Sequence, residues 1–221
     1  IVCTDYLRSK IEGEMILNIG DELIKPKSCV KNLGAYLDNE MSMKDQIKSV
    51  CRSSYASLHS LGRIRKFLDE DSVQTLVHAF VTCKVDSLNG LLSGVSDHVC
   101  SLNKLQMILN TAARLIFRLR KYDHITDVLV KLHWLPIQAR IDFKLLILTY
   151  KALNGDGPAY LMDLLRLRKY KRNTRAAADS LILVTPDSRL KSLGDRSFSY
   201  TSSKLWNSLP LDIRSSPSLS I

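Results

Sequence analysis

The chain has 221 residues, 45% hydrophobic and 24% charged, enough to build the core of one large domain or two small ones. Its 32 Lys and Arg against 22 Asp and Glu give a net charge of +10, which favours an anionic partner, nucleic acid first and a membrane surface second. No apolar run reaches the ~18 residues of a membrane span, so we expect no membrane insertion.

Cysteine use indicates a reducing compartment. The five cysteines, at 3, 29, 51, 83 and 100, are widely spaced and form no Cys-x-x-Cys pair. We expect them to be small buried side chains in an intracellular protein, nuclear or cytoplasmic, with no metal site. Charged residues interrupt any signal peptide near the start. The chain begins with Ile1 and ends abruptly at Ile221, so we expect it to be a piece of something longer.

Residues 1–38 predict extended structure. Apolar residues alternate between 15 and 19, a turn is expected at Gly20–Asp21, and a return strand follows. Residues 29–38 predict a third extended segment, in which Gly34 indicates a bulge or the close approach of another backbone.

From residue 43 the apolar period becomes helical and predicts helices over 43–66, 71–88, 97–118, 126–132 and 136–154. The last begins with Pro136 at its first position and ends at Asn154–Gly155. Because it is apolar on both sides, we expect it to be a central helix on which the other elements pack.

The region after residue 160 has a different amino-acid composition. Six of the ten residues in 166–175 are basic and none is acidic, 181–184 predicts a short strand, and Ser and Pro become common towards the end. We therefore expect a β segment over 1–38, a helical domain over 39–160 and an irregular basic C-terminal tail over 161–221.

Few residues suggest catalysis. There is no glycine-rich phosphate loop and no Ser/His/Asp signature, and the histidines fall in separate elements. The one acidic cluster, 69–71, is explained by helix capping. We predict no catalytic residue and no metal ligand.

Basic residues at the helix ends and in the tail are the candidate nucleic-acid contacts. Arginine forks suit phosphate oxygens, and Tyr170 could stack on a base or sugar. If ~5 phosphates are neutralised, log K falls with log salt at a slope of about 4. A solvated linker is the alternative for the tail run. The candidates are Arg63, Arg65, Lys66, Arg114, Arg118, Arg168, Lys169, Lys171 and Arg172.

Several motifs occur in a characteristic order: LGAYLD at 33–38, LVHAFV at 76–81, LQ at 105–106 with NTAARLI at 110–116, LHWLP at 132–136 with RIDFK at 140–144, YKALNG at 150–155, PAYL at 158–161 and LWNSLP at 205–210. Together they resemble the C-terminal part of LINE-type (non-LTR) retrotransposon reverse transcriptases of the jockey-like kind. The resemblance covers about residues 15–221.

The resemblance implies that the chain holds the end of a palm near the primer grip, then thumb-like helices, then a C-terminal extension. The primer-grip-like residues would be Leu33, Gly34, Leu37 and Asp38. In this family the polymerase aspartates and their Mg²⁺ belong to the palm upstream, and this sequence contains no Asp-Asp pair. The chain departs from the family at 84–89, where the usual Tyr and Cys of a turn are missing.

Residues and resemblance together predict a mainly α fold: a thumb-like bundle, a small N-terminal β segment and an irregular basic tail. The predicted function is that of a fragment of an RNA-directed DNA polymerase, inactive alone and without cofactor, that binds an RNA–DNA duplex largely independently of sequence. The alternative is a domesticated protein–protein module or a relic without function. Basic groups sharing one face would favour nucleic acid; dispersed ones would favour the alternative.

Overall fold

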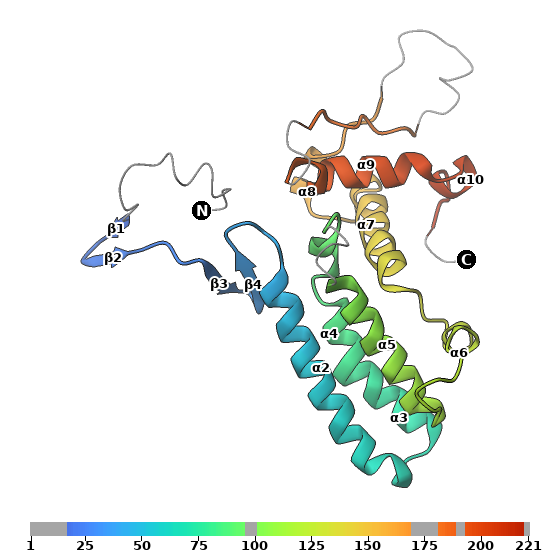
Figure 1. The fold of residues 1–221 in the computed structure, drawn as a ribbon. Coiled ribbons are helices and arrows are strands. Elements are labelled where there is room, and N and C mark those ends of the chain that lie inside the picture. Colours follow the sequence, from blue (N-terminus) through green and yellow to red (C-terminus); the bar gives the residue numbers. More distant parts are fainter. Residues whose placement is uncertain (1–16, 96–100, 169–180, 189–192, 219–221) are drawn as a thin grey trace. The chain divides into compact units, whose positions relative to one another are not determined.

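The computed structural model describes residues 17–95, 101–168, 181–188 and 193–218. Of these residues 60% are helical and 8% lie in strands, which confirms a mainly α chain with a small N-terminal β segment. The chain divides into two compact units (Figure 1). The first holds Ile1–Leu91 and Val95–Ile137, and the second holds Leu92–Gly94 and Gln138–Ile221. The sequence-based boundaries at 38 and 160 stay predictions.

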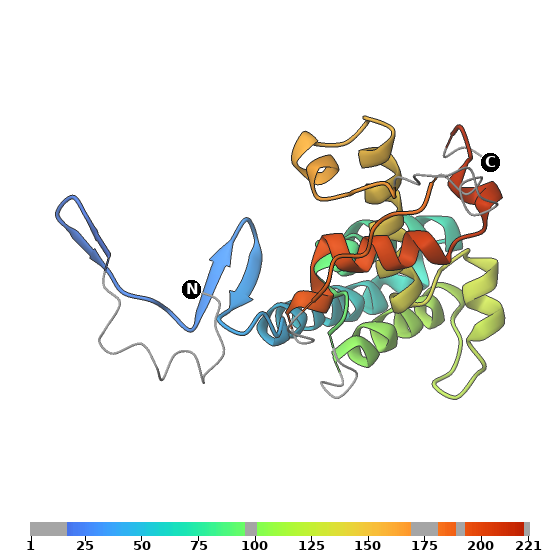
Figure 2. The same ribbon diagram turned by 90° about the horizontal axis from the view of Figure 1, so that it is seen from above.

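The β segment consists of two separate hairpins, as Figure 2 shows. Strand β1 (Leu17–Ile19) pairs antiparallel with β2 (Glu22–Ile24) across the turn predicted at Gly20–Asp21, which confirms that turn. Strand β3 (Cys29–Asn32) pairs with β4 (Ala35–Asp38) in the same way.

The prediction of one extended segment over 29–38 is wrong, because the chain reverses at Leu33 and Gly34. Their φ angles are 47° and 88°, and two successive positive φ values are the backbone of a tight hairpin turn. The expected reason for Gly34 is wrong as well. A Cβ placed there would meet nothing within 4 Å, so the glycine serves the turn and not the approach of another backbone.

Hydrogen bonds connect the second hairpin to the first long helix, α2 (Lys44–Ile64). The Asp38 carboxylate accepts hydrogen bonds from the backbone N–H groups of Ser42 (2.7 Å) and Met43 (2.8 Å). Gln46 on α2, a buried polar residue, accepts one from the N–H of Tyr36 on β4 at 2.9 Å. These bonds hold the corner between strand and helix, where Met43 has a strained φ of 59°.

Three helical segments form the body of the first unit: α2, α3 (Glu70–Val77) with its continuation α4 (Cys83–Asp86), and α5 (Ser101–Phe117). They lie side by side in both ribbon views (Figure 1, Figure 2), and each contacts the other two. A short helix, α6 (Thr126–Lys131), follows. Helical backbone is thus confirmed within the predicted ranges 43–66, 71–88, 97–118 and 126–132, of which 97–100 lie outside the described residues. Their buried apolar residues include Ile47, Leu58, Leu61, Val73, Val77, Leu105, Ile108, Leu109, Ala112 and Ile116.

The predicted helix over 71–88 is one run of helical backbone but not one α-helix, because a π turn at His78–Thr82 joins α3 to α4. Thr82 Oγ1 donates to the carbonyl oxygen of His78 at 3.0 Å and lies 2.6 Å from its ring Nδ1. Four buried valines, Val73, Val77, Val81 and Val85, follow one another at intervals of four. Since an α-helix turns about 100° per residue, such a stripe drifts about 40° per step, and the wider π turn offsets that drift.

The second unit contains α7 (Ile137–Leu153), α8 (Ala159–Asp163), α9 (Phe198–Ser208) and α10 (Leu211–Arg214). The expectation of an irregular tail is therefore wrong for 193–218, which contains α9 and α10. Trp206 on α9 is buried in a hydrophobic core. That core consists of Tyr150, Ala152, Leu165, Leu183 and Trp206.

The predicted ends of α7 agree with the structure to within one residue, although Pro136 precedes the helix and does not begin it. The expected role of α7 is not confirmed. Most of the buried apolar side chains of the first unit lie on α2, on α3 with its continuation, and on α5, so α7 is not the central helix of that unit. Its second apolar face is also incompletely covered, since Phe143 is 55% exposed.

The strand predicted over 181–184 is wrong, because the segment forms only an isolated antiparallel bridge, Leu167 to Leu183, with two backbone hydrogen bonds to 166–168. On its other edge the backbone pairs with side chains of α9. Asn207 donates to the carbonyl of Leu183 and accepts from its N–H, both at 2.9 Å. The indole N–H of Trp206 donates to the carbonyl of Leu181 at 2.7 Å. One amide side chain thus takes the place of a neighbouring strand.

Candidate nucleic-acid interface

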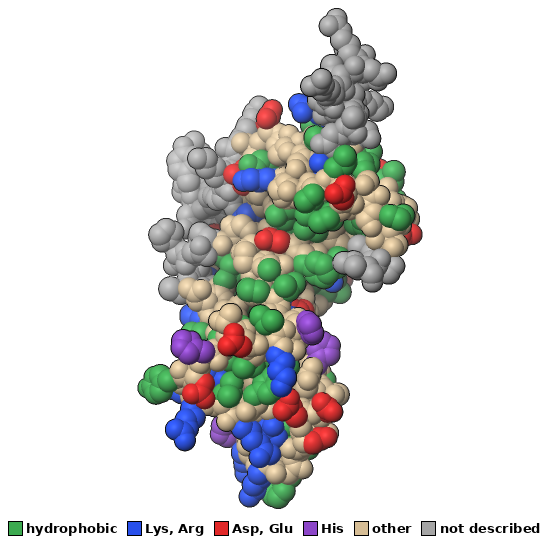
Figure 3. Space-filling view, turned by 90° about the vertical axis from the view of Figure 1, so that its right-hand side faces the viewer, with side chains coloured by type: hydrophobic (Ala, Val, Ile, Leu, Met, Phe, Trp, Pro, Cys, Tyr) green, Lys and Arg blue, Asp and Glu red, His purple; other side chains and the backbone are tan. Residues whose placement is uncertain are grey.

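The basic ends of α2 and α5 meet at one end of the first unit. Arg65 follows α2 in the 3-10 turn Arg65–Phe67, and its Nε and Nη2 donate to the carbonyls of Leu115 (2.9 Å) and Ile116 (2.6 Å) in the last turn of α5. Figure 3 shows Lys and Arg side chains gathered at the lower end of the molecule. We call this group the basic end; it comprises Arg63, Arg65, Lys66, Arg114, Arg118, Arg120 and Lys121.

The predicted phosphate contacts of the basic end differ in what their side chains already do. Arg65 is half-buried and gives a third hydrogen bond to the carbonyl of Leu68, so it holds the 3-10 turn on α5. Arg114 is half-buried and donates to the carbonyl of Asp123 at 3.4 Å. Arg63, Lys66 and Arg118 are exposed. Arg118 gives one exposed hydrogen bond, to the carbonyl of Arg65 at 3.4 Å, so all three can reach a phosphate without giving up a buried contact.

Arg118 owes its position to the way α5 ends. It has a φ of 52°, and the next N–H, that of Leu119, donates to the carbonyl of Arg114 at 3.0 Å. This is the left-handed cap at which glycine is usual. An arginine there turns out of the helix, and its Nη2 donates to the carbonyl of Arg65 after α2 at 3.4 Å.

Acidic residues also lie at the basic end, and two of them are engaged in local structure. Asp69 caps α3 by accepting from the N–H of Ser72 at 3.2 Å, as the sequence predicts, and hydrogen bonds with Ser72 lower the pKa of its carboxyl. Asp123 accepts from the N–H of Arg120 at 2.7 Å. With Glu70 and Asp71 the acids number four against seven basic residues, which leaves a net charge of +3.

Two exposed aromatic rings, which the sequence analysis did not single out, stand beside lysines at this end. Phe67 lies 4.8 Å from the Nζ of Lys66, and Tyr122 lies 5.6 Å from that of Lys121, measured to the ring centroids. Both rings could have been found from the sequence, because each belongs to a Lys-aromatic dipeptide, Lys66–Phe67 or Lys121–Tyr122, directly after a predicted helix.

The tail candidates cannot be joined to this group. Arg168 is exposed in the second unit, and its N–H donates to the carbonyl of Ile182 at 2.8 Å. Lys169, Lys171 and Arg172 lie outside the described residues, as does Tyr170. Their predicted role stays a prediction.

The primer-grip-like residues occupy the second hairpin. Leu33 and Gly34 form its turn, with Leu33 96% exposed, and Leu37 is half-buried. Burial would raise the pKa of the Asp38 carboxyl, but hydrogen bonds from Ser42, Met43 and Glu40 outweigh it and lower that pKa. The hydrogen bonds of Asp38 are therefore those of a structural corner between β4 and α2.

Other chemistry finds little support in the described part of the chain. Among the residues that the structure describes, no three His, Cys, Asp or Glu side chains come together as possible metal ligands. No helix in the described ranges is long and apolar enough to cross a membrane.

The described cysteines, Cys29, Cys51 and Cys83, are unpaired. The prediction that they are buried is wrong, since two are half-buried and Cys83 is exposed. Burial raises the pKa of the Cys51 thiol, and burial with the Asp45 carboxylate raises that of Cys29. Neither is an activated thiolate.

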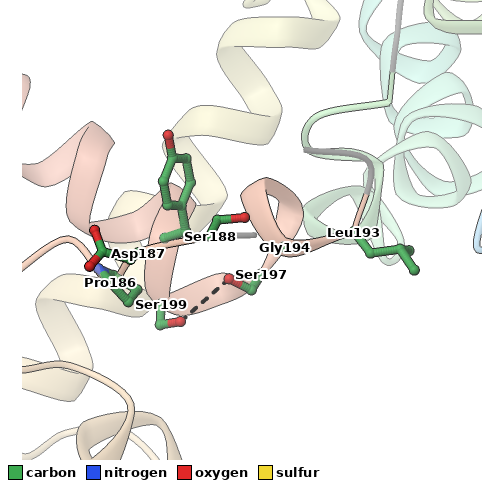
Figure 4. Close-up of a pocket in the computed structure, with 8 residues that line it drawn as sticks. Pro186, Asp187, Ser188, Leu193, Gly194, Ser197 and Ser199 are labelled. Carbon is green, nitrogen blue, oxygen red and sulfur yellow. Dashed lines mark hydrogen bonds between the residues drawn. The ribbon is translucent and has the colours of Figure 1, made fainter. Parts of the chain in front are cut away.

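A pocket of about 450 Å³ lies in the second unit (Figure 4). Ser197 Oγ lies 3.4 Å from Ser199 Oγ, and the described lining contains neither His, Lys nor Arg. The described lining therefore offers no imidazole or amine to activate a serine and no cation to hold an anion. Its lining is Pro186, Asp187, Ser188, Leu193, Gly194, Ser197, Ser199 and Tyr200.

Comparison of the chain with models of protein families, with curated proteins and with solved structures found no match.

Proposed function

We propose that the chain is the C-terminal part of a LINE-type retrotransposon reverse transcriptase, with thumb-like helices, and that it binds template–primer nucleic acid through the phosphate backbone. The order of sequence motifs supports the family. The observation that carries the binding function is the convergence of the α2 and α5 ends, which brings five of the nine predicted basic contacts to one end of one unit.

Binding of this kind would be largely independent of sequence. Arg63, Lys66 and Arg118 are exposed, and their charges can pair with phosphates that carry no base information. Arg65 contributes by holding the end of α2 on the end of α5, and Arg114 by holding the turn after α5 through the carbonyl of Asp123. The charge of both adds to the local field.

Polymerisation is not part of the proposal. Nucleotidyl transfer by two metal ions needs carboxylates that hold Mg²⁺ beside the incoming phosphates. The sequence has no Asp-Asp pair, and we assign those carboxylates to a palm outside this chain. We expect no primer extension by the purified chain. An intracellular location, nuclear or cytoplasmic, stays an expectation from the sequence.

The test is binding of a fluorescent RNA–DNA hybrid by anisotropy at several salt concentrations. One variant carries Arg63→Gln, Lys66→Gln and Arg118→Gln. Its matched control removes three exposed charges from the first half of α2, by Lys44→Gln, Lys48→Gln and Arg52→Gln, so both variants have the same net charge.

We expect steep weakening with salt for the unmodified chain. The basic-end variant should lose about 1 unit of the log–log salt slope per phosphate contact removed, and the control should lose much less. Equal losses in both variants would mean that general charge, and not the basic end, binds the hybrid. No binding at low salt by the folded chain would refute the proposal.

A protein–protein module is the second candidate, favoured by the apolar side chains of the two hairpins. Ile19 is 63% and Leu23 67% exposed, and an isolated two-stranded hairpin is only marginally stable. If the folded chain does not bind the hybrid, the double substitution Ile19→Ser/Leu23→Ser should abolish any self-association seen by analytical ultracentrifugation. Unchanged self-association would remove the hairpin surface from consideration.

A further inference from the structure

Two aromatic rings at the basic end face solvent. Phe67 is 75% exposed at the end of the 3-10 turn after α2, and Tyr122 is 88% exposed in the turn after α5. An exposed ring forgoes the stabilisation that burial would give, so neither adds much to the fold. A single exposed aromatic residue is ordinary, but two beside cations at one end of a unit are a pattern typical of nucleic-acid surfaces.

Both rings stand on backbone that is fixed. The turn of Phe67 is held on α5 by two hydrogen bonds of Arg65, and a third, to the carbonyl of Leu68, closes the turn itself. The turn of Tyr122 is closed between Arg120 and Asp123 in both directions, at 2.7 and 3.2 Å, and Arg114 joins it to α5. The rings are therefore presented to solvent by structure that other residues maintain.

We infer that Phe67 and Tyr122 are stacking platforms for the unpaired bases of single-stranded RNA or DNA. This inference rests on the proposed function and narrows it. In a duplex the base faces are covered by their neighbours, whereas a single strand offers a free face to an aromatic ring. The Nζ of Lys66 lies over the Phe67 ring and that of Lys121 over the Tyr122 ring. These charges, with that of the exposed Arg118, are available to the same strand's phosphates. The ligand expected is therefore a hybrid that carries a single-stranded extension.

The test compares a blunt RNA–DNA hybrid with the same hybrid carrying a single-stranded extension of about ten nucleotides, of RNA in one arm and DNA in the other. The test variant is Phe67→Leu/Tyr122→Leu, which keeps apolar side chains but removes the flat rings. The matched control is Tyr55→Leu/Phe80→Leu, which removes the same two ring types at positions 41% and 49% exposed elsewhere in the first unit. Circular dichroism checks the folding of each.

We expect the unmodified chain to bind the extended hybrid more tightly than the blunt one. The test variant should lose about 10-fold or more of that preference while its affinity for the blunt hybrid and its salt slope stay unchanged. A 2-aminopurine base in the extension should change its fluorescence on binding only while the rings are present. The control should behave like the unmodified chain.

Two results would overturn the inference. If the blunt hybrid binds with the expected salt dependence but the test variant keeps the full preference, the stacking role is wrong and the proposed function survives. If neither hybrid binds to the folded chain, the proposed function fails and the inference fails with it.

Discussion

Arg63 and Arg65 lie two positions apart in sequence, yet the structure predicts that replacing Arg65 lowers stability and that replacing Arg63 scarcely does. Arg65 donates three hydrogen bonds to backbone carbonyls, two of them at the end of α5, whereas Arg63 is exposed on the last turn of α2. At about 1 kcal/mol net for each bond of a half-buried group, Arg65→Met should lower the free energy of unfolding by about 3 kcal/mol. Arg63→Met should lower it by less than about 0.5 kcal/mol.

Urea unfolding followed by far-ultraviolet circular dichroism measures the difference. With a urea m value of about 2 kcal/mol/M, Arg65→Met should move the midpoint down by about 1.5 M, and Arg63→Met should scarcely move it. Under conditions where both variants are folded, Arg63→Met should reduce the salt slope of hybrid binding by about 1 unit. Equal stability of the two variants would refute the reasoning, because Arg65 would then not hold the turn on α5.

Three further predictions concern Asp38, Leu33 and Asn207. Because the pKa of Asp38 is lowered on folding, its stabilisation is complete above the unfolded value of about 3.9 and is lost as the pH falls through the folded value; Asp38→Asn should therefore flatten the acid side of a plot of melting temperature against pH. Leu33→Asn, which suits a positive φ, should stabilise the hairpin by about 0.5–1 kcal/mol, measured by amide hydrogen exchange, and should weaken hybrid binding only if Leu33 contacts the primer. Asn207→Leu leaves two backbone groups of Leu183 unpaired and should cost about 3 kcal/mol in urea unfolding, against less than about 0.5 kcal/mol for Ser208→Ala.

The helices were predictable from sequence because their apolar residues recur at the helical period. The predicted ranges 43–66, 126–132 and 136–154 agree within two residues with Lys44–Ile64, Thr126–Lys131 and Ile137–Leu153. Capping by Asp69 was predictable for the same local reason, since its partner is three residues away.

Contacts between distant residues were not predictable from periodicity. Arg65 binds carbonyls 50 and 51 residues away, and Asn207 replaces a strand for a segment 24 residues away. The groups that Arg65 and Asn207 contact are backbone groups, which every residue type carries, so the sequence gives no sign of them. The turn at Leu33 was missed for a different reason: leucine rarely adopts a positive φ, so the sequence favours a strand there.

The π turn at His78–Thr82 has a consequence for how the chain can change its length. Val73 and Val85 are twelve residues apart, so a regular α-helix would rotate one about 120° from the other. After deletion of one residue within the π turn the interval is eleven, and a regular α-helix would leave them only about 20° apart. The same deletion in the middle of α2 would rotate half of its buried residues by about 100°. This turn is therefore the place in the bundle where a residue can be lost while both halves of the helix keep their buried face.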